Sequence, residues 1–115
     1  MKLAIVGSRT FEDYDVMKKF IIDNIDINSI TDIISGGARG ADRLGERFAA
    51  EFNKNLIIFR ADWNKYGKRA GFIRNVDIIN ECDFCVAFWD GESHGTKHDI
   101  ELCIEKQKPY LIYKF

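Results

Sequence analysis

The chain has 115 residues, enough for one domain with its own hydrophobic core and too few for two. Its 46% of hydrophobic and 30% of charged residues are ordinary for a globular protein, and none of its apolar runs is long enough to cross a bilayer. The 17 basic and 18 acidic residues give a net charge of −1, which argues against a nucleic-acid binder that is basic throughout.

The first element starts almost at the N-terminus. Residues 3–6 are a continuous apolar run, which is typical of a strand buried on both faces of a parallel sheet. This early start leaves no room for a signal peptide, so we expect a cytoplasmic protein with no membrane partner. Asp13 is a suitable N-cap for the helix that follows, and a second strand is expected near residues 30–34.

A glycine-rich turn at residues 35–42 separates the second strand from a helix expected from about Asp42 to Phe52. After a third strand at 56–59, residues 61–71 combine two aromatic residues, three basic residues and two glycines, and they are expected to form a loop over a ligand. The remaining helix, strand, helix and strand are expected at residues 72–79, 84–89, 100–104 and 110–113.

Five buried-type strands alternating with four helical segments predict an α/β fold. We expect a single Rossmann-like domain over residues 1–115, with an open parallel sheet in the order 3-2-1-4-5 and helices on both faces. Ligands of such sheets bind beyond the carboxyl ends of the strands, where the strand order reverses. The turns after the first, second and fourth strands should therefore face one crevice.

The glycine-rich turn is the most specific part of the sequence. Its glycines let the backbone turn tightly and approach a ligand, and amides at the start of the next helix favour an anion such as phosphate. A dinucleotide fingerprint is a weaker interpretation, because Ser35 occupies the place of its first glycine, although Asp62 has the spacing of its ribose-binding acid. The alternative is that the glycines serve the turn alone.

Two further turns carry residues suited to a phosphate. Ser8 can bond a ligand oxygen and Arg9 can add a charge-assisted contact, unless Arg9 is simply solvated. Gly95 and Thr96 can hold a phosphate at the start of the last helix, and the alternative is that Thr96 or Ser93 caps that helix with no ligand.

These motifs resemble the SLOG superfamily. The residues that carry the resemblance are Gly7-Ser8-Arg9-x-Phe11, the turn Ser35-Gly36-Gly37-Ala38-Arg39-Gly40-Ala41-Asp42, and Gly95-Thr96. The superfamily joins DNA-processing protein A and the "lonely guy" phosphoribohydrolases, and the chain is most similar to its small stand-alone YspA-related branch. The resemblance implies a Rossmann-like domain that binds nucleotides or nucleotide-derived molecules without a cofactor, as a homo-oligomer, most simply a dimer.

The resemblance also implies a reaction, hydrolysis of the bond between a base and ribose 5-phosphate. Arg74 falls where these enzymes have the arginine of an Arg-Lys pair, and Asp99 takes the place of their glutamate. In these roles Arg74 anchors the phosphate or assists the leaving group, and Asp99 stabilises the ribose cation or positions a water. The loop of residues 90–96 is longer than theirs and lacks their paired glycines. The alternative for Arg74 and Asp99 is an ordinary ion pair on helix surfaces.

The candidate site combines two catalytic residues with a larger set of ligand-binding residues from the three turns. The catalytic candidates are Arg74 and Asp99, and the ligand-binding candidates are Gly7, Ser8, Arg9, Ser35, Gly36, Gly37, Ala38, Arg39, Gly40, Asp42, Trp89, Asp90, Gly91, Ser93, Gly95 and Thr96. We expect no metal site, because His94 and His98 have no third ligand, and we expect the pair Cys82 and Cys85 to be buried.

The leading hypothesis is that the protein binds a nucleotide or nucleotide-derived molecule at the carboxyl edge of the sheet. Hydrolysis of its N-glycosidic bond is the reaction that the resemblance adds to this hypothesis. The first alternative is a sensing or sequestering module without catalysis. Binding of single-stranded DNA is a further alternative, by analogy with DNA-processing protein A. The net charge of −1 argues against it, and the only basic cluster in the sequence spans residues 65–69. A subunit with a vestigial pocket is the last alternative.

Overall fold

Five parallel strands form one sheet in the order β3-β2-β1-β4-β5, as the sequence predicts. The structure is a computed structural model that describes residues 1–115. The strands are β1 (Lys2–Gly7), β2 (Asp32–Ser35), β3 (Asn55–Ile58), β4 (Phe84–Trp89) and β5 (Tyr110–Lys114). Successive connections move outward from β1 to β3 and then return past β1 to β4, so the order reverses between β1 and β4.

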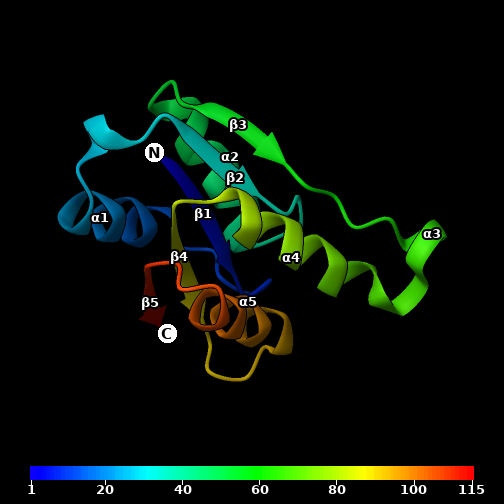
Figure 1. Cartoon of the computed structure of the whole chain (residues 1–115). Helices are drawn as coiled ribbons and strands as arrows, with labels where there is room; N and C mark the ends of the chain where they lie inside the picture. The colour runs from blue at the N-terminus through cyan, green and yellow to red at the C-terminus, as the bar shows by residue number, and fades with distance from the viewer.

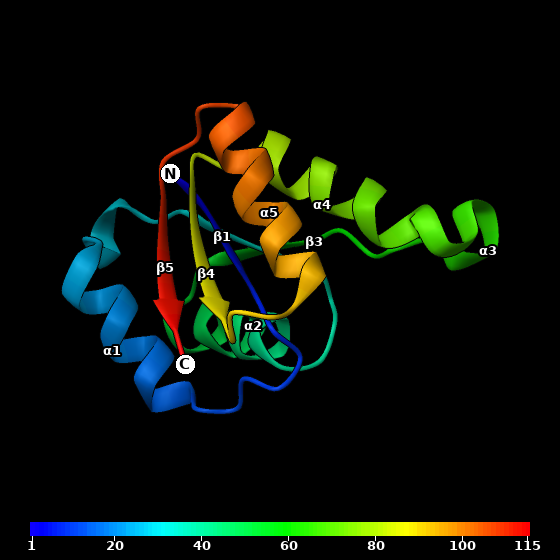
Figure 2. The same cartoon turned by 90° about the horizontal axis from the view of Figure 1, so that it is seen from below.

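Helices cover both faces of this sheet (Figure 1; Figure 2). The long helices are α1 (Tyr14–Asn24), α2 (Ala41–Glu51), α4 (Ala70–Glu81) and α5 (His94–Glu105). A short helix α3 (Trp63–Tyr66) and two 3-10 turns, Ile27–Ser29 and Gly67–Arg69, complete the chain. Figure 2 shows α1 and α2 on one side of the strands and α4 and α5 on the other. The predicted α/β architecture is therefore confirmed.

The central strand β1 divides the hydrophobic core into two layers. Leu3 and Ile5 pack into the cluster under α1 and α2, whereas Ala4 and Val6 pack into the cluster under α4 and α5. Because successive side chains of a strand point to opposite faces, a continuous apolar run is what a strand buried on both sides requires.

The two edge strands are less buried than their sequences predict. Leu56 of β3 is 41% exposed and Ile112 of β5 is 38% exposed. The apolar run alone cannot tell a central strand from an edge strand, because only the tertiary position decides how much of each face is covered.

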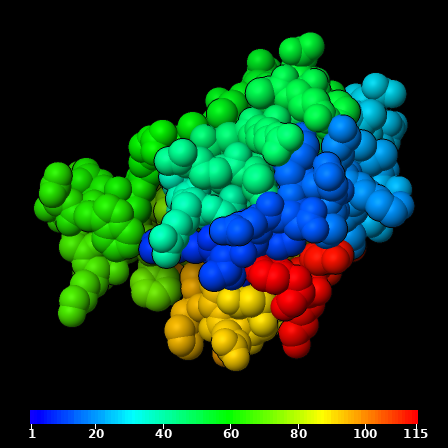
Figure 3. All heavy atoms as spheres, turned by 180° about the vertical axis from the view of Figure 1, so that it is seen from behind, coloured from blue at the N-terminus to red at the C-terminus, as the bar shows by residue number.

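The prediction of a loop over residues 61–71 is wrong. Asp62 caps α3 by accepting a hydrogen bond from the Lys65 N–H (3.1 Å), and the 3-10 turn at Gly67–Arg69 leads directly into α4. Together these elements form an arm, residues 60–72, that extends from the body and is coloured green in Figure 3. The cap at Asp62 was a readable signal for a helix start.

Cys82, Cys85 and Cys103 are all free and buried, as predicted for the first two, and burial raises the pKa of the Cys82 thiol to about 12. None of the helices combines the length and the apolar character that crossing a membrane would require.

Candidate functional site

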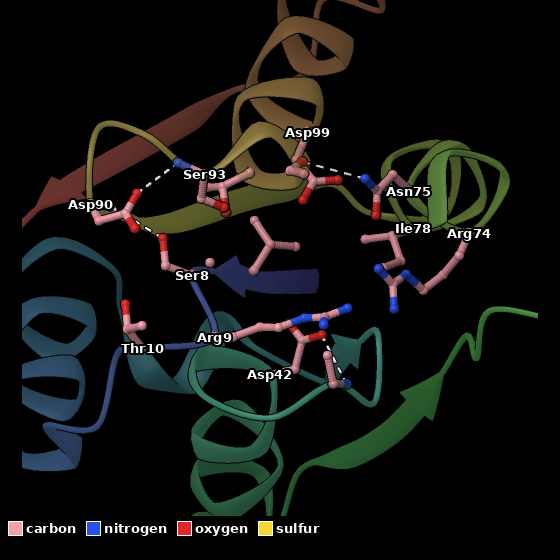
Figure 4. Close-up of a pocket in the computed structure, with 15 residues that line it drawn as sticks. Ser8, Arg9, Thr10, Asp42, Arg74, Asn75, Ile78, Asp90, Ser93 and Asp99 are labelled. Atoms are coloured by element: carbon pink, nitrogen blue, oxygen red, sulfur yellow. Dashed lines mark hydrogen bonds between the residues drawn. The ribbon is translucent and has the colours of Figure 1, made fainter. Parts of the chain in front are cut away.

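A crevice of about 340 Å³ opens where the carboxyl ends of β1 and β4 meet, at the point where the strand order reverses (Figure 4). The three turns that the sequence singles out all contribute to it. The predicted residues that line it are Gly7, Ser8, Arg9, Ala38, Asp42, Arg74, Asp90, Ser93, Gly95, Thr96 and Asp99. This position is the one where open α/β sheets bind their ligands.

Ser8 holds the three turns together. Its N–H donates to the Phe88 carbonyl (2.9 Å), its carbonyl accepts from the Ala41 N–H (3.3 Å), and its Oγ accepts from the Asp90 N–H (3.2 Å). The residue is 2% exposed, so these bonds are shielded from water. Ser8 thus fixes the relative position of the ends of β1 and β4 and the start of α2, besides lining the crevice.

The glycine-rich turn is shaped by contacts within the protein. Gly40 has φ 77°, and a Cβ there would lie 2.5 Å from the carbonyl oxygen of Arg9. Ser35 is fully buried, and its hydroxyl accepts from the Gly37 N–H (3.1 Å) and contacts Glu46 (3.0 Å). Both residues were predicted to bind ligand, but neither lines the crevice. Their observed role is to hold the turn in place.

Both helices that begin at the crevice lack a side-chain cap. The N-cap of α2 is Gly40, which has no side chain, and Ser93 at the N-cap of α5 makes no capping hydrogen bond. Asp13 and Asp62 cap α1 and α3, which begin elsewhere, whereas α4 also lacks a side-chain cap but continues directly from the 3-10 turn at Gly67–Arg69. An uncapped helix start leaves N–H groups without acceptors and carries positive partial charge.

The loop that leads into α5 is fixed by Asp90. The Oδ1 atom of its carboxylate accepts from the N–H groups of Glu92 (2.9 Å) and Ser93 (2.8 Å), and these bonds hold the pKa of Asp90 below its usual range. The Ser93 hydroxyl lies 3.2 Å from the Thr96 hydroxyl. These bonds hold both hydroxyls at the mouth of the crevice.

Two buried carboxyl groups face the crevice. Asp42 is 7% exposed and Asp99 is 5% exposed. Burial raises the pKa of Asp42 to about 6, against a hydrogen bond from the Ala38 N–H (3.1 Å) that lowers it. Burial, with the neighbouring Asp42, raises the pKa of Asp99 well above its ordinary value, and its Oδ1 has no hydrogen-bond partner.

Arg74 enters the same space from α4. Its Nη1 donates to the Gly36 carbonyl (3.2 Å), while its Nε is buried without a partner. Figure 4 shows Arg9 and Arg74 extending toward each other from opposite sides, between Asp42 and Asn75. Arg74 and Asp99 are therefore not an ion pair on helix surfaces. The protein's four ion pairs all use lysines, and none involves an arginine.

The sequence did not single out Thr10 and Asn75 as binding residues, yet both line the crevice. Asn75 is 4% exposed, and its amide donates to the Gly95 carbonyl (3.3 Å) and lies 3.2 Å from His98 Nδ1. It thereby joins α4 to the start of α5. An asparagine within an apolar helix stripe was the available signal, because a buried amide needs partners.

The other predicted residues lie outside the crevice. Gly36, Gly37 and Arg39 line an adjoining hollow, whereas Trp89 bonds to the Ser93 carbonyl (3.1 Å) and Gly91 faces Lys114. The acid of the dinucleotide fingerprint, Asp62, caps α3 instead. No group of three or more potential metal ligands is present.

The fold and the crevice together define a Rossmann-like protein whose site lies at the reversal of strand order. The sequence model of the YspA, cpYpsA-related SLOG family matches residues 1–66, which carry two of the three turns. The Gene 61 protein of Mycobacterium phage D29 is 35% identical over 104 residues, covering 84% of this chain and 83% of that protein. The chain belongs to this SLOG family.

A solved structure shares the fold. DNA processing protein A from Helicobacter pylori, a protein with a single-stranded DNA binding mode, superposes with a TM-score of 0.67 at 20% sequence identity. The alignment covers 97% of this chain and 64% of that one, so the present chain spans less than two thirds of the larger protein.

Proposed function

We propose that the crevice binds a nucleotide or a nucleotide-derived small molecule, with its phosphate between the first turns of α2 and α5. The observation that carries the proposal is the convergence of two uncapped helix starts, in helices of 11 and 12 residues, on one crevice. Arg9 and Arg74 border the same space and have no carboxylate partner at ion-pair distance. Free amides and guanidinium groups are the donors that bind phosphate.

The carboxyl groups suit the remainder of a nucleotide. A ribose offers hydroxyl groups, which donate to a carboxylate and accept from a protonated carboxyl. With its pKa near 6, Asp42 is mainly ionised at neutral pH, while burial favours the neutral form of Asp99. The crevice volume of about 340 Å³ lies at the lower end of the range of about 300–1,000 Å³ for ligand pockets, which fits one nucleotide.

Hydrolysis of the N-glycosidic bond is the reaction that this pair of carboxyls favours. Two acids whose pKa values are pushed apart by their surroundings can divide the roles of acid and base. A neutral Asp99 would protonate the departing base as the bond from the ribose C1′ to nitrogen breaks. Ionised Asp42 would accept a proton from water as its oxygen bonds to C1′, so the products are free base and ribose 5-phosphate.

Single-stranded DNA is the second ligand class, and the fold shared with DNA processing protein A is what favours it. The net charge of −1 argues against an extended basic surface. A short strand end nevertheless presents the same phosphate and ribose as a free nucleotide, so the binding experiment includes it.

The test is calorimetric titration with nucleoside 5′-monophosphates, the matching nucleosides and a single-stranded oligonucleotide. We expect monophosphates to bind. Arg74→Ala should lower their affinity about 10-fold or more, because the variant loses a charge-assisted hydrogen bond. The matched control is Arg43→Ala, an exposed arginine on α2 that does not line the crevice. Nucleosides binding as tightly as monophosphates, or equal losses in both variants, would contradict the phosphate site.

The reaction is tested separately by incubating the protein with each monophosphate and measuring free base by chromatography. Base release that disappears in Asp99→Asn while monophosphate binding persists would support the assigned acid. Binding without base release would contradict hydrolysis of these nucleotides and leave a binding module.

A further inference from the structure

Two hollows adjoin the crevice on the side of the arm. One, of about 520 Å³, lies between the glycine-rich turn and Arg60 to Trp63, and the other, of about 190 Å³, lies between Trp63 and Gly95. Both share Arg9 and Arg74 with the crevice, so the three spaces adjoin one another at these two side chains. We call the two hollows together the shelf.

The shelf differs from the crevice in charge. The basic side chains that line it are Arg9, Arg39, Arg60, Lys68 and Arg74, and no acidic side chain lines either hollow. None of these cations takes part in an ion pair. In a protein of net charge −1, this concentration of positive charge outside any ion pair gives the shelf an electrostatic attraction for anions.

The glycine-rich turn is also the support on which two of these arginines lie. A Cβ at Gly36 would be 3.2 Å from Arg74 Cδ, and a Cβ at Gly37 would be 2.9 Å from Arg60 Nη1. The missing side chains therefore leave room for Arg74 beside Gly36 and for Arg60 beside Gly37.

An aromatic ring completes the shelf. Trp63 is 53% exposed and lies against Gly71, where a Cβ would be 3.5 Å from Trp63 Cη2. Phe72, also half exposed, is held edge-on against His98 with ring centroids 4.7 Å apart. Exposed rings beside unpaired cations are the arrangement on which nucleobases stack while their phosphates bind the cations.

We infer that the ligand is larger than one nucleotide: a second nucleoside, joined through phosphate to the one in the crevice, lies on the shelf. The phosphate attached to this second nucleoside contacts Arg60, and the second base stacks on Trp63. The inference rests on the proposed function, since the crevice must hold the first nucleotide. A free dinucleotide and the end of a nucleic-acid strand share this chemistry.

The test compares the affinities of AMP, a pyrophosphate-linked diadenosine and a 5′-phosphorylated deoxyadenosine dinucleotide. Trp63→Ala and Arg60→Ala remove the shelf contacts. The matched controls are Tyr66→Ala and Lys65→Ala, which lie on the same arm but line neither hollow. Thermal melting establishes that each variant is folded.

We expect at least one dinucleotide to bind the unaltered protein about 10-fold or more tightly than AMP, as one stacked base contributes. Trp63→Ala and Arg60→Ala should each remove most of that gain while leaving AMP affinity within about twofold, and the controls should retain it. Which linkage binds more tightly identifies the source of the ligand.

Equal affinity for AMP and both dinucleotides would overturn the inference and leave the proposed function standing. If Tyr66→Ala lowers the dinucleotide affinity as much as Trp63→Ala does, the inference is likewise overturned and the proposed function stands. Absence of binding by all three ligands would overturn the proposed function, and with it the inference.

Discussion

Replacing Asp42 by asparagine should make the protein more stable at neutral pH. Burial raises the pKa of this carboxyl from 3.8 to about 6, so ionising it costs the folded state free energy that it does not cost the unfolded state. A difference of about two pKa units corresponds to about 3 kcal/mol. Asparagine has nearly the same shape, and its carbonyl can still accept from the Ala38 N–H.

The sign of the effect follows from proton uptake. Between pH 3.8 and about 6 the folded protein binds more protons at Asp42 than the unfolded chain, so stability falls as pH rises through this range. This decrease in stability is complete once the pH lies above the pKa that Asp42 has in the folded protein. The free energy of unfolding of Asp42→Asn, relative to the unaltered protein, should therefore increase by up to about 3 kcal/mol between pH 4 and 7.5.

The assay is urea denaturation at a series of pH values. Asp77→Asn is the matched control, because Asp77 is exposed on α4 and its replacement should leave the pH dependence unchanged. Parallel pH curves for Asp42→Asn and the unaltered protein would refute the argument that this carboxyl is held at a raised pKa.

Three further results are expected. Gly40→Ala should lose about 2 kcal/mol or more in urea denaturation, because a Cβ at φ 77° would lie 2.5 Å from the Arg9 carbonyl oxygen, whereas Gly95→Ala, with no atom within 4 Å, should change little. Ser8→Ala should lower the unfolding free energy by about 1 kcal/mol through loss of the bond from the Asp90 N–H; an unchanged midpoint would contradict this. Calorimetric affinity for AMP should fall several-fold as salt rises from about 0.05 to 0.5 M, and a constant affinity would argue against cation contacts.

The sequence predicts the architecture well because its evidence is local. Apolar runs such as residues 3–6 identify buried strands, and Asp13 was correctly identified as the cap of α1. The alternation of strands and helices predicted the Rossmann-like strand order, and that order placed the unusual turns at one edge of the sheet. The same reasoning could not separate edge from central strands, since Leu56 owes its exposure to the absence of a further strand beside it.

The site was predictable as a set of turns but not as a set of roles. Ser35 and Gly40 belong to the motif, and only the three-dimensional contacts show that they hold the turn in place without lining the crevice. Asp99 was expected either to stabilise a ribose cation or position a water, or to form a surface ion pair, and neither expectation took account of its burial, which depends on helices far apart in the chain. The helical arm was not predicted, because the aromatic, basic and glycine residues of 61–71 were interpreted as a loop and Asp62 was not considered as a helix cap.

The central claim is that the uncapped starts of α2 and α5 hold a phosphate. It is tested most directly by an NMR titration of backbone amides with AMP, using adenosine as the reference. We expect the shifts that require phosphate to be largest at the amides of Gly95, Thr96 and Asp42. Phosphate-dependent shifts that fall elsewhere, or their absence at saturating AMP, would contradict it.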